Sequence, residues 1–182
     1  MPTQADLPRN RMAVIVPSAF MNSLAIGLTN LGLLFLVKDL YQASPAQVGW
    51  FGATWSIFYF SACILFKRFT DKLAPRVSMV IMLSGSALVM GAFLAFRGLP
   101  QAFIAYASYG LLTAFFWPPL MGWLSRGLEG SSLSKAASLF NTSWSLGGVL
   151  APWLGGLLYE AGRFLPVWTA LALFVLNAVF VL

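Results

Sequence analysis

Hydroxyl, amide and aromatic side chains recur at helical spacing inside long apolar stretches, and they are the residues best suited to binding chemistry. Tyr106, Gly110, Thr113 and Trp117 follow one another at intervals of three and four residues, so they share one helical face. A face with hydroxyl groups and aromatic rings suits a cavity for an amphipathic ligand. Packing between helices, with the tryptophan as a filler, is the competing explanation at each position.

Amide and hydroxyl side chains in two other apolar stretches form a second group of candidates. Ser18, Asn22 and Thr29 fall on one face of the first apolar stretch. Asn141 and Ser145 lie one turn apart in the fifth stretch. Amides in hydrocarbon need polar partners, so these residues must face protein or water. A binding cavity and hydrogen bonds between helices both satisfy that requirement.

The residue types also exclude several kinds of chemistry. The chain has no histidine, which removes imidazole metal sites and every histidine-based catalytic arrangement. Its one cysteine, Cys63, lies in an apolar run and is expected to be a buried, inert thiol. No acidic or basic residue occupies the middle of an apolar stretch, where such residues mark ion or proton sites. We therefore expect no enzyme activity, no cofactor and no metal site.

Composition indicates the solvent in which the elements must fold. Hydrophobic residues make up 59% of the 182 residues and charged residues 9%, and the mean hydropathy is +0.81. A soluble domain carries about 25% charged residues. The chain cannot enclose so much apolar surface in a polar shell, so its main partner is the lipid bilayer. The net charge of +6 lies in short loops, which favours a topology signal over nucleic-acid binding.

Charge-free runs predict six transmembrane helices, since about 20 apolar residues cross a hydrocarbon core of roughly 30 Å. The predicted fold class is therefore an all-α integral membrane protein. Residues 1–11 are expected to form a cytoplasmic N-terminal segment, and 12–182 a six-helix transmembrane bundle. The predicted spans are residues 12–37, 46–66, 77–96, 101–125, 136–159 and 166–182. Ser44 and Pro45 suit the N-cap and first position of the second helix.

Basic residues predict the orientation. Three of them fall on one side of the predicted bundle: Lys38, Arg97 and Arg163. Eight fall on the other: Arg9, Arg11, Lys67, Arg68, Lys72, Arg76, Arg126 and Lys135. The richer side is the cytoplasmic one, so we expect a cytoplasmic N-terminus in a multi-pass protein of the plasma (inner) membrane. The sixth run meets no terminating charge before Leu182, so we expect further chain beyond it.

The loop after the second predicted span carries a recognisable pattern. Residues 67–76, K-R-F-T-D-K-L-A-P-R, resemble the loop G-x-x-x-D-[RK]-x-G-[RK]-[RK] of the major facilitator superfamily. Asp71, Lys72 and Arg76 match its acid, the following base and the final base. Two glycines and one base are replaced, by Lys67, Ala74 and Pro75. The resemblance implies a cytoplasmic charge clamp that releases during conformational switching. A basic loop that only sets topology is the alternative.

The fifth predicted span carries a second pattern. Residues 147–156, G-G-V-L-A-P-W-L-G-G, resemble the superfamily motif G-x-x-x-G-P-x-x-G-G, with Ala151 as the only departure. That motif is associated with antiporters, mainly exporters. Small residues one turn apart, starting from Gly147 and from Gly148, predict the close approach of another helix. Pro152 weakens the helix locally. Ordinary tight packing is the alternative to a switching role.

The whole chain thus resembles the N-terminal six-helix half of a major facilitator superfamily transporter. In that family the first and fourth helices of each half line the central cavity. The implied cavity residues are Asn22, Thr29, Tyr106, Thr113, Trp117 and Asn141, with Asn22 first. The implied switching residues are Asp71, Lys72, Arg76, Gly147, Ala151, Pro152, Gly155 and Gly156. Many proton-coupled members carry an arginine where this chain has Tyr106, which argues against arginine-based proton coupling.

The resemblance implies alternating access, with a small-molecule substrate held between two halves near the midplane. It favours an efflux antiporter for a small, partly apolar molecule, completed by a second six-helix half beyond Leu182. An uptake facilitator or symporter of the same fold stays open. So do a non-transporting membrane scaffold and a membrane enzyme that relies on loop residues.

Overall fold

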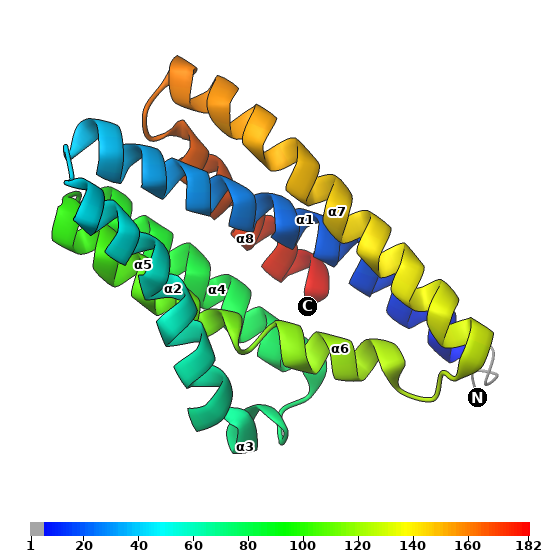
Figure 1. Cartoon of the computed structure of the whole chain (residues 1–182). Helices are drawn as coiled ribbons and strands as arrows, with labels where there is room; N and C mark the ends of the chain where they lie inside the picture. The colour runs from blue at the N-terminus through cyan, green and yellow to red at the C-terminus, as the bar shows by residue number, and fades with distance from the viewer. Residues whose placement is uncertain (1–5) are drawn as a thin grey trace.

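The computed structural model describes residues 6–182, and their side chains from Arg11 onward (Figure 1). All secondary structure in this part of the chain is helical, as the sequence predicts. The elements are α1 (Asp6–Phe35), the π-helical turn η1 (Leu36–Leu40), α2 (Pro45–Leu65), α3 (Lys67–Thr70), α4 (Pro75–Ala95), α5 (Leu99–Thr113), α6 (Trp117–Ser125), α7 (Gly130–Ala161) and α8 (Leu165–Val181).

Local sequence explains where several helices begin. Ser44 caps α2, because its hydroxyl accepts a hydrogen bond from the Gln47 backbone N–H at 3.3 Å. The Gln47 side chain accepts one from the Ser44 N–H at 2.8 Å, which completes a capping box. Pro45 then occupies the first turn, where the missing N–H has no intrahelical partner to lose. The predicted cap at Ser44 is confirmed.

The long helices pack as an open row rather than a closed ring. Helix α1 lies between α7 and α8, α8 also packs on α4, and α5 lies between α4 and α2. Helices α2 and α7 therefore form the two edges of the row, and the short α6 contacts α4, α1 and α7. Figure 1 shows α1 and α7 running side by side along most of their length. The side of the bundle between α2 and α7 is left open.

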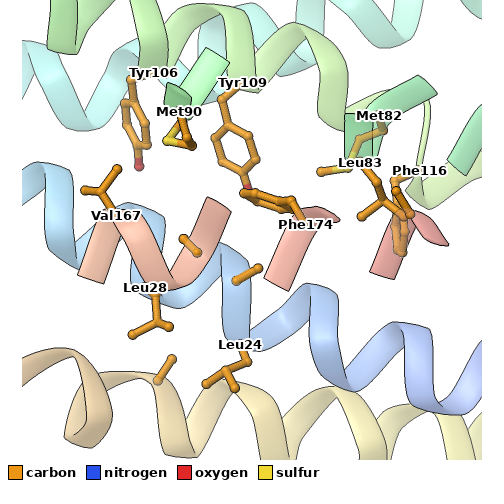
Figure 2. Close-up of a cluster of buried hydrophobic side chains, with 14 of the residues drawn as sticks. Leu24, Leu28, Met82, Leu83, Met90, Tyr106, Tyr109, Phe116, Val167 and Phe174 are labelled. Atoms are coloured by element: carbon orange, nitrogen blue, oxygen red, sulfur yellow. The ribbon is translucent and has the colours of Figure 1, made fainter. Parts of the chain in front are cut away.

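The core fills the space between α1, α4, α5 and α8. Tyr109 of α5 lies against Phe174 of α8, with ring centroids 6.0 Å apart, and both are fully buried. Figure 2 shows Met82 and Leu83 of α4 beside Phe116 in the same layer. Leu24 and Leu28 of α1 point the other way, toward α7 (Figure 2). The core is thus continuous across α1, which has neighbours on both sides.

The connections gather at two ends of the bundle. The described N-terminus, α3 and the α6–α7 connection lie toward one end in Figure 1, and the α1–α2, α4–α5 and α7–α8 connections toward the other. Contacts tie each end together. Arg97 places its guanidinium 4.1 Å from the Phe164 ring centroid at the second end. The segments that carry the basic residues assigned to one side by the sequence, namely the start of α1, the α2–α4 connection with the start of α4, and the α6–α7 connection with the start of α7, lie toward the first end.

Four helical segments are long and apolar enough to cross a membrane: Arg11–Leu40, Pro45–Leu65, Pro75–Ala95 and Leu99–Ser125. Helix α8 is apolar but has 17 residues. Helix α7 has 32 residues, and serine, threonine and asparagine side chains interrupt the apolar character of its first half. The structure therefore supports a multi-helix membrane protein, while the crossing of six spans stays a prediction.

Candidate functional site

An aromatic pair connects α6 with α7, which forms one edge of the row of helices. Trp117, the first residue of α6, meets Trp144 of α7 edge to face, with ring centroids 4.4 Å apart and planes at 85°. Phe140 of α7 lies 6.2 Å from the Trp117 ring. Both tryptophans are half-buried, so part of each ring stays accessible. Trp144 was missed from sequence, although it lies three residues after the candidate Asn141.

Trp117 owes its position to an interruption between α5 and α6. Residues 114–116 form a turn instead of a continuous helix. Pro118 and Pro119 explain the turn, because neither has the N–H that a helix would donate to the carbonyl four residues earlier. The double proline therefore breaks the helix and redirects the chain just before Trp117.

The interruption separates residues that the sequence placed on one face. Tyr106 stacks on Phe51 of α2, with ring centroids 4.3 Å apart. At Gly110 an added Cβ would lie 2.7 Å from the carbonyl oxygen of Trp55, so α2 approaches α5 closely there. Thr113 is fully buried, and its hydroxyl donates to the Tyr109 carbonyl at 2.8 Å. Trp117 instead faces α7, so these four positions do not form one surface.

Helix α7 presents three different sectors around its axis. Its buried stripe, which packs on α1, consists of Ala136, Phe140, Ser143, Gly147, Ala151 and Gly155. An exposed polar sector consists of Ser134, Ser138, Asn141, Thr142 and Ser145. An exposed apolar sector consists of Leu139, Leu146, Val149, Leu150, Trp153 and Leu157. The helical repeat places the polar sector on the side of the buried stripe where Trp144 lies.

The polar sector of α7 is the more informative of its two exposed faces. Apolar side chains are at home against lipid tails, whereas an amide in hydrocarbon without a partner is costly. Asn141 and Ser145 lie one turn apart and follow Lys135, the last basic residue before the apolar part of α7. In a membrane this sector must therefore face water or another polar protein surface. Among the predicted cavity residues, Asn141 is the one that lies exposed in this sector.

The candidate residues on α1 lie elsewhere. Asn22 and Thr29 are fully buried inside the bundle, as is Ser18. Asn177 of α8 donates from its amide nitrogen to the Ser18 carbonyl at 3.1 Å. Both polar atoms of the Asn22 amide lack a hydrogen-bond partner among the described residues. Buried amides are normally satisfied, so Asn22 requires an internal water or a conformation in which it meets a polar group.

The loop at residues 67–76 is organised by one ion pair and one cation–π contact. The Lys67 ammonium lies 2.6 Å from the Asp71 carboxylate, within and just after α3. Both side chains are more than half exposed, so this pair contributes only about 0.3–0.5 kcal/mol. Arg76 places its guanidinium 5.5 Å from the ring centroid of Trp123 on α6. Lys72 is exposed.

Arg11 gives the same end of the bundle a contact that sequence reasoning missed. Its guanidinium donates to the Trp123 carbonyl at 3.1 Å and to the Arg126 carbonyl at 2.8 Å. Helix α6 ends at Ser125, so Arg11 satisfies carbonyls at a helix C-terminus, where a cation is favoured. From sequence Arg11 was interpreted only as a topology signal. Its partners lie more than a hundred residues away, and no local pattern indicates them.

The two glycine stripes of α7 have different surroundings. An added Cβ at Gly147 would lie 2.7 Å from the Phe20 carbonyl oxygen of α1. Ala151 faces Gly27 of α1 across an equally tight contact. The stripe that includes Pro152 is more open, because an added Cβ at Gly156 meets nothing within 4 Å. Close approach of another helix is therefore present along the first stripe only.

Apolar helices of membrane-crossing length, one of whose neighbours carries an exposed polar sector and half of an aromatic pair, indicate a multi-pass membrane protein. Among the described residues no group of three or more metal-binding side chains occurs. The family model described as Major Facilitator Superfamily matches residues 15–182. The chain belongs to the Major Facilitator Superfamily, a family of transporters.

A curated relative gives a further comparison. The chain is similar to a quinolone resistance transporter from Acinetobacter baumannii, with 30% identity over 136 residues. The match covers 72% of this chain and 30% of that relative, so the chain spans less than a third of the relative's length. The resemblance found from the loop and glycine motifs thus agrees with the family, and it supports a transporter in place of an enzyme.

Proposed function

We propose that this chain is the N-terminal six-helix half of a secondary transporter that works by alternating access and exports a small, partly apolar molecule. A second six-helix half would cover the open side between α2 and α7, with the substrate held between the halves. The match to less than a third of a curated transporter supports a longer complete protein. The export direction is supported by the glycine motif of α7 and by the relative named as a quinolone resistance transporter.

One observation carries the proposal, namely the polar sector of α7 beside the tryptophan pair. Asn141 and Ser145 offer hydrogen bonds, and Trp117 and Trp144 offer accessible aromatic surface. Such a combination suits a molecule with a flat apolar part and a polar edge. No acidic or basic side chain belongs to this sector or to the pair, so we propose that its substrate is recognised without a buried counter-ion. A quinolone, named for the relative, is the first compound to test.

The proposed switching devices are the loop at residues 67–76 and the glycine motif of α7. Asp71 is the only acid among the loop's bases, so it has alternative partners within the loop. Lys67, Lys72 and Arg76 are the candidates for those partners. Gly147, Ala151 and Gly155 hold α7 against α1, while Pro152 and Gly156 lie on its more open side. We propose that α7 moves with α1 as one body when the open side closes.

Transport by the full-length protein in inside-out vesicles tests this function. We expect energised vesicles to accumulate a fluorescent quinolone, and we expect Trp117→Ala and Asn141→Ala to raise its KM. Leu139→Ala, on the apolar sector of the same helix, is the matched control and should leave the KM unchanged. Accumulation only in right-side-out vesicles would replace export by uptake. Absence of flux for a broad panel, with intact folding, would remove the transporter assignment.

A further inference from the structure

A buried hydrogen bond links the first turn of α4 to the interruption between α5 and α6. The Ser78 hydroxyl donates to the Phe115 carbonyl oxygen at 2.7 Å. Ser78 is fully buried, and Phe115 is 9% exposed. Water therefore has little access to this carbonyl, and the hydroxyl of Ser78 is its partner in the described structure.

The Phe115 carbonyl needs that partner because of Pro119. In a regular helix the N–H of residue 119 would donate to the carbonyl of residue 115, and proline has no N–H. The turn instead uses shorter bonds, with Phe115 donating to the Leu112 carbonyl at 2.9 Å and Phe116 to the Thr113 carbonyl at 3.1 Å. Neither bond satisfies the Phe115 oxygen. A side chain from another helix therefore replaces the bond that the proline removes.

Helix α4 contacts α6 at a second point in the same turn. Two residues before Ser78, Arg76 lies over the ring of Trp123, near the end of α6. Ser78 thus fixes the segment that precedes α6, while Arg76 contacts its far end. Since Trp117 is the first residue of α6, the direction of α6 determines where the Trp117 ring meets Trp144.

The side chain of Phe115 extends this connection to α2 and α3. Its ring centroid lies 5.6 Å from that of Phe66 and 6.1 Å from that of Phe69. Phe66 directly precedes the loop with the signature pattern, and Phe69 is the third residue of that loop. Phe115 is therefore held through its ring by the loop and through its carbonyl by α4.

We propose that Ser78 is a positioning residue that fixes the interruption between α5 and α6 and thereby holds Trp117 in the surface shared with Trp144. Its effect on transport rests on the proposed function, whereas its effect on the interruption does not. The proposal makes Ser78 and Pro119 an interdependent pair. The Ser78 hydroxyl is needed because Pro119 cannot donate to the Phe115 carbonyl. It becomes redundant when residue 119 has an N–H that can donate to that carbonyl.

Hydrogen exchange of the full-length protein in lipid nanodiscs tests the pair without any substrate. Ser78→Ala should speed exchange of the backbone amides of Phe116, Trp117 and Leu120 about tenfold, since it leaves a buried carbonyl without a partner. Pro119→Ala restores a backbone N–H, so adding Ser78→Ala to it should change exchange by less than about twofold. Ser86→Ala is the matched control. Ser86 is a fully buried serine of the same helix whose hydroxyl has no partner among the described residues.

Two results would overturn the proposal. One is that Ser78→Ala speeds hydrogen exchange equally whether residue 119 is proline or alanine. The other is that Ser78→Ala alone leaves hydrogen exchange unchanged. If Ser78→Ala does not fold, recovery of folding in the Ser78→Ala/Pro119→Ala protein supports it, and failure of that double variant contradicts it.

Transport gives the functional measurement. Ser78→Ala should raise the substrate KM about tenfold with little change in maximal rate, and Pro119→Ala in the same chain should restore the KM. A KM that Pro119→Ala does not restore would overturn the role in positioning Trp117. If neither the wild-type protein nor any variant transports, but hydrogen exchange changes as expected, the proposed function is wrong. The role of Ser78 in fixing the interruption between α5 and α6 is then still supported.

Discussion

The backbone of Gly147 in α7 lies against that of Phe20 in α1 with no room for a side chain between them. A Cβ at Gly147 would lie 2.7 Å from the Phe20 carbonyl oxygen and 2.8 Å from the Ser23 Cβ. Hydrogen bonds cross the same interface, since Ser23 donates to the Trp144 carbonyl at 2.7 Å and Ser143 donates to the Val16 carbonyl. These contacts make α1 and α7 a single structural unit, with Trp144 at its edge.

Replacement of Gly147 by alanine should therefore destabilise the protein. The new Cβ meets backbone, which cannot rotate aside, and overpacking of this kind costs about 1–3 kcal/mol. Gly156→Ala, nine residues further along the same helix, meets nothing within 4 Å and gains helix propensity. Thermal unfolding of the purified protein should show a lower Tm for Gly147→Ala and an equal or higher Tm for Gly156→Ala. Equal Tm values for the two variants would contradict the packing.

The ion pair between Lys67 and Asp71 allows a test of whether the loop acts in conformational switching or in stability. Asp71→Asn should lower the Tm very little, because an exposed pair between residues four apart contributes about 0.3–0.5 kcal/mol. If Asp71 exchanges partners during transport, the same variant should slow the maximal transport rate severalfold. Lys67→Gln removes only the partner seen in this conformation, so it should have the smaller effect on rate. Identical transport rates for Asp71→Asn and wild type would leave the loop as a topology signal.

Substitution of Asn22 tests whether its buried amide is needed for transport rather than for stability. Both polar atoms of its side chain are buried without a described partner, so Asn22→Leu should maintain or raise the Tm. If the amide meets substrate or water during the transport cycle, that stable variant should transport poorly. Thr29→Val, at the other fully buried cavity candidate on α1 whose hydroxyl has no described partner, should behave in the same way. Full transport by Asn22→Leu would exclude Asn22 from the cavity, and a large drop in Tm would show that its amide has a structural partner.

Orientation can be tested by single cysteines in a Cys63→Ser background. Gln42, in the α1–α2 connection, and Ser131, at the start of α7, are both exposed and belong to opposite ends of the bundle. We expect a membrane-impermeant maleimide added to intact cells to label Gln42→Cys and not Ser131→Cys. The reverse pattern would place the N-terminus outside and overturn the orientation predicted from the basic residues.

Local features of the sequence predicted local features of the structure. Ser44 and Pro45 carry their own signal for the start of α2, and Pro118 and Pro119 for the end of α5, because capping and proline geometry depend on neighbouring residues only. The helical face of a polar residue is predictable in the same way. What lies opposite that face is not, since it depends on how helices distant in sequence are arranged.

The candidate site shows this difference residue by residue. Asn22 and Asn141 are both predicted cavity residues, yet Asn22 is fully buried within the bundle and Asn141 is exposed. Trp144 and Ser78 gave no signal of their own, because their roles come from Trp117 and from a carbonyl that Pro119 leaves free. The sequence alone shows that the predicted spans lack charged residues. That absence favours a substrate that is recognised without a buried counter-ion.

The most direct test of the central proposal compares two sectors of α7 in the full-length, cysteine-free protein in membranes. Single cysteines at Asn141 and Ser145 sample the polar sector, and single cysteines at Leu146 and Trp153 sample the apolar one. If the polar sector faces a water-filled transport path, a small water-soluble thiol reagent should modify positions 141 and 145, and substrate should protect them. Positions 146 and 153 should react little, with or without substrate. Equal labelling of both sectors, or labelling of the polar sector that substrate does not change, would contradict the account.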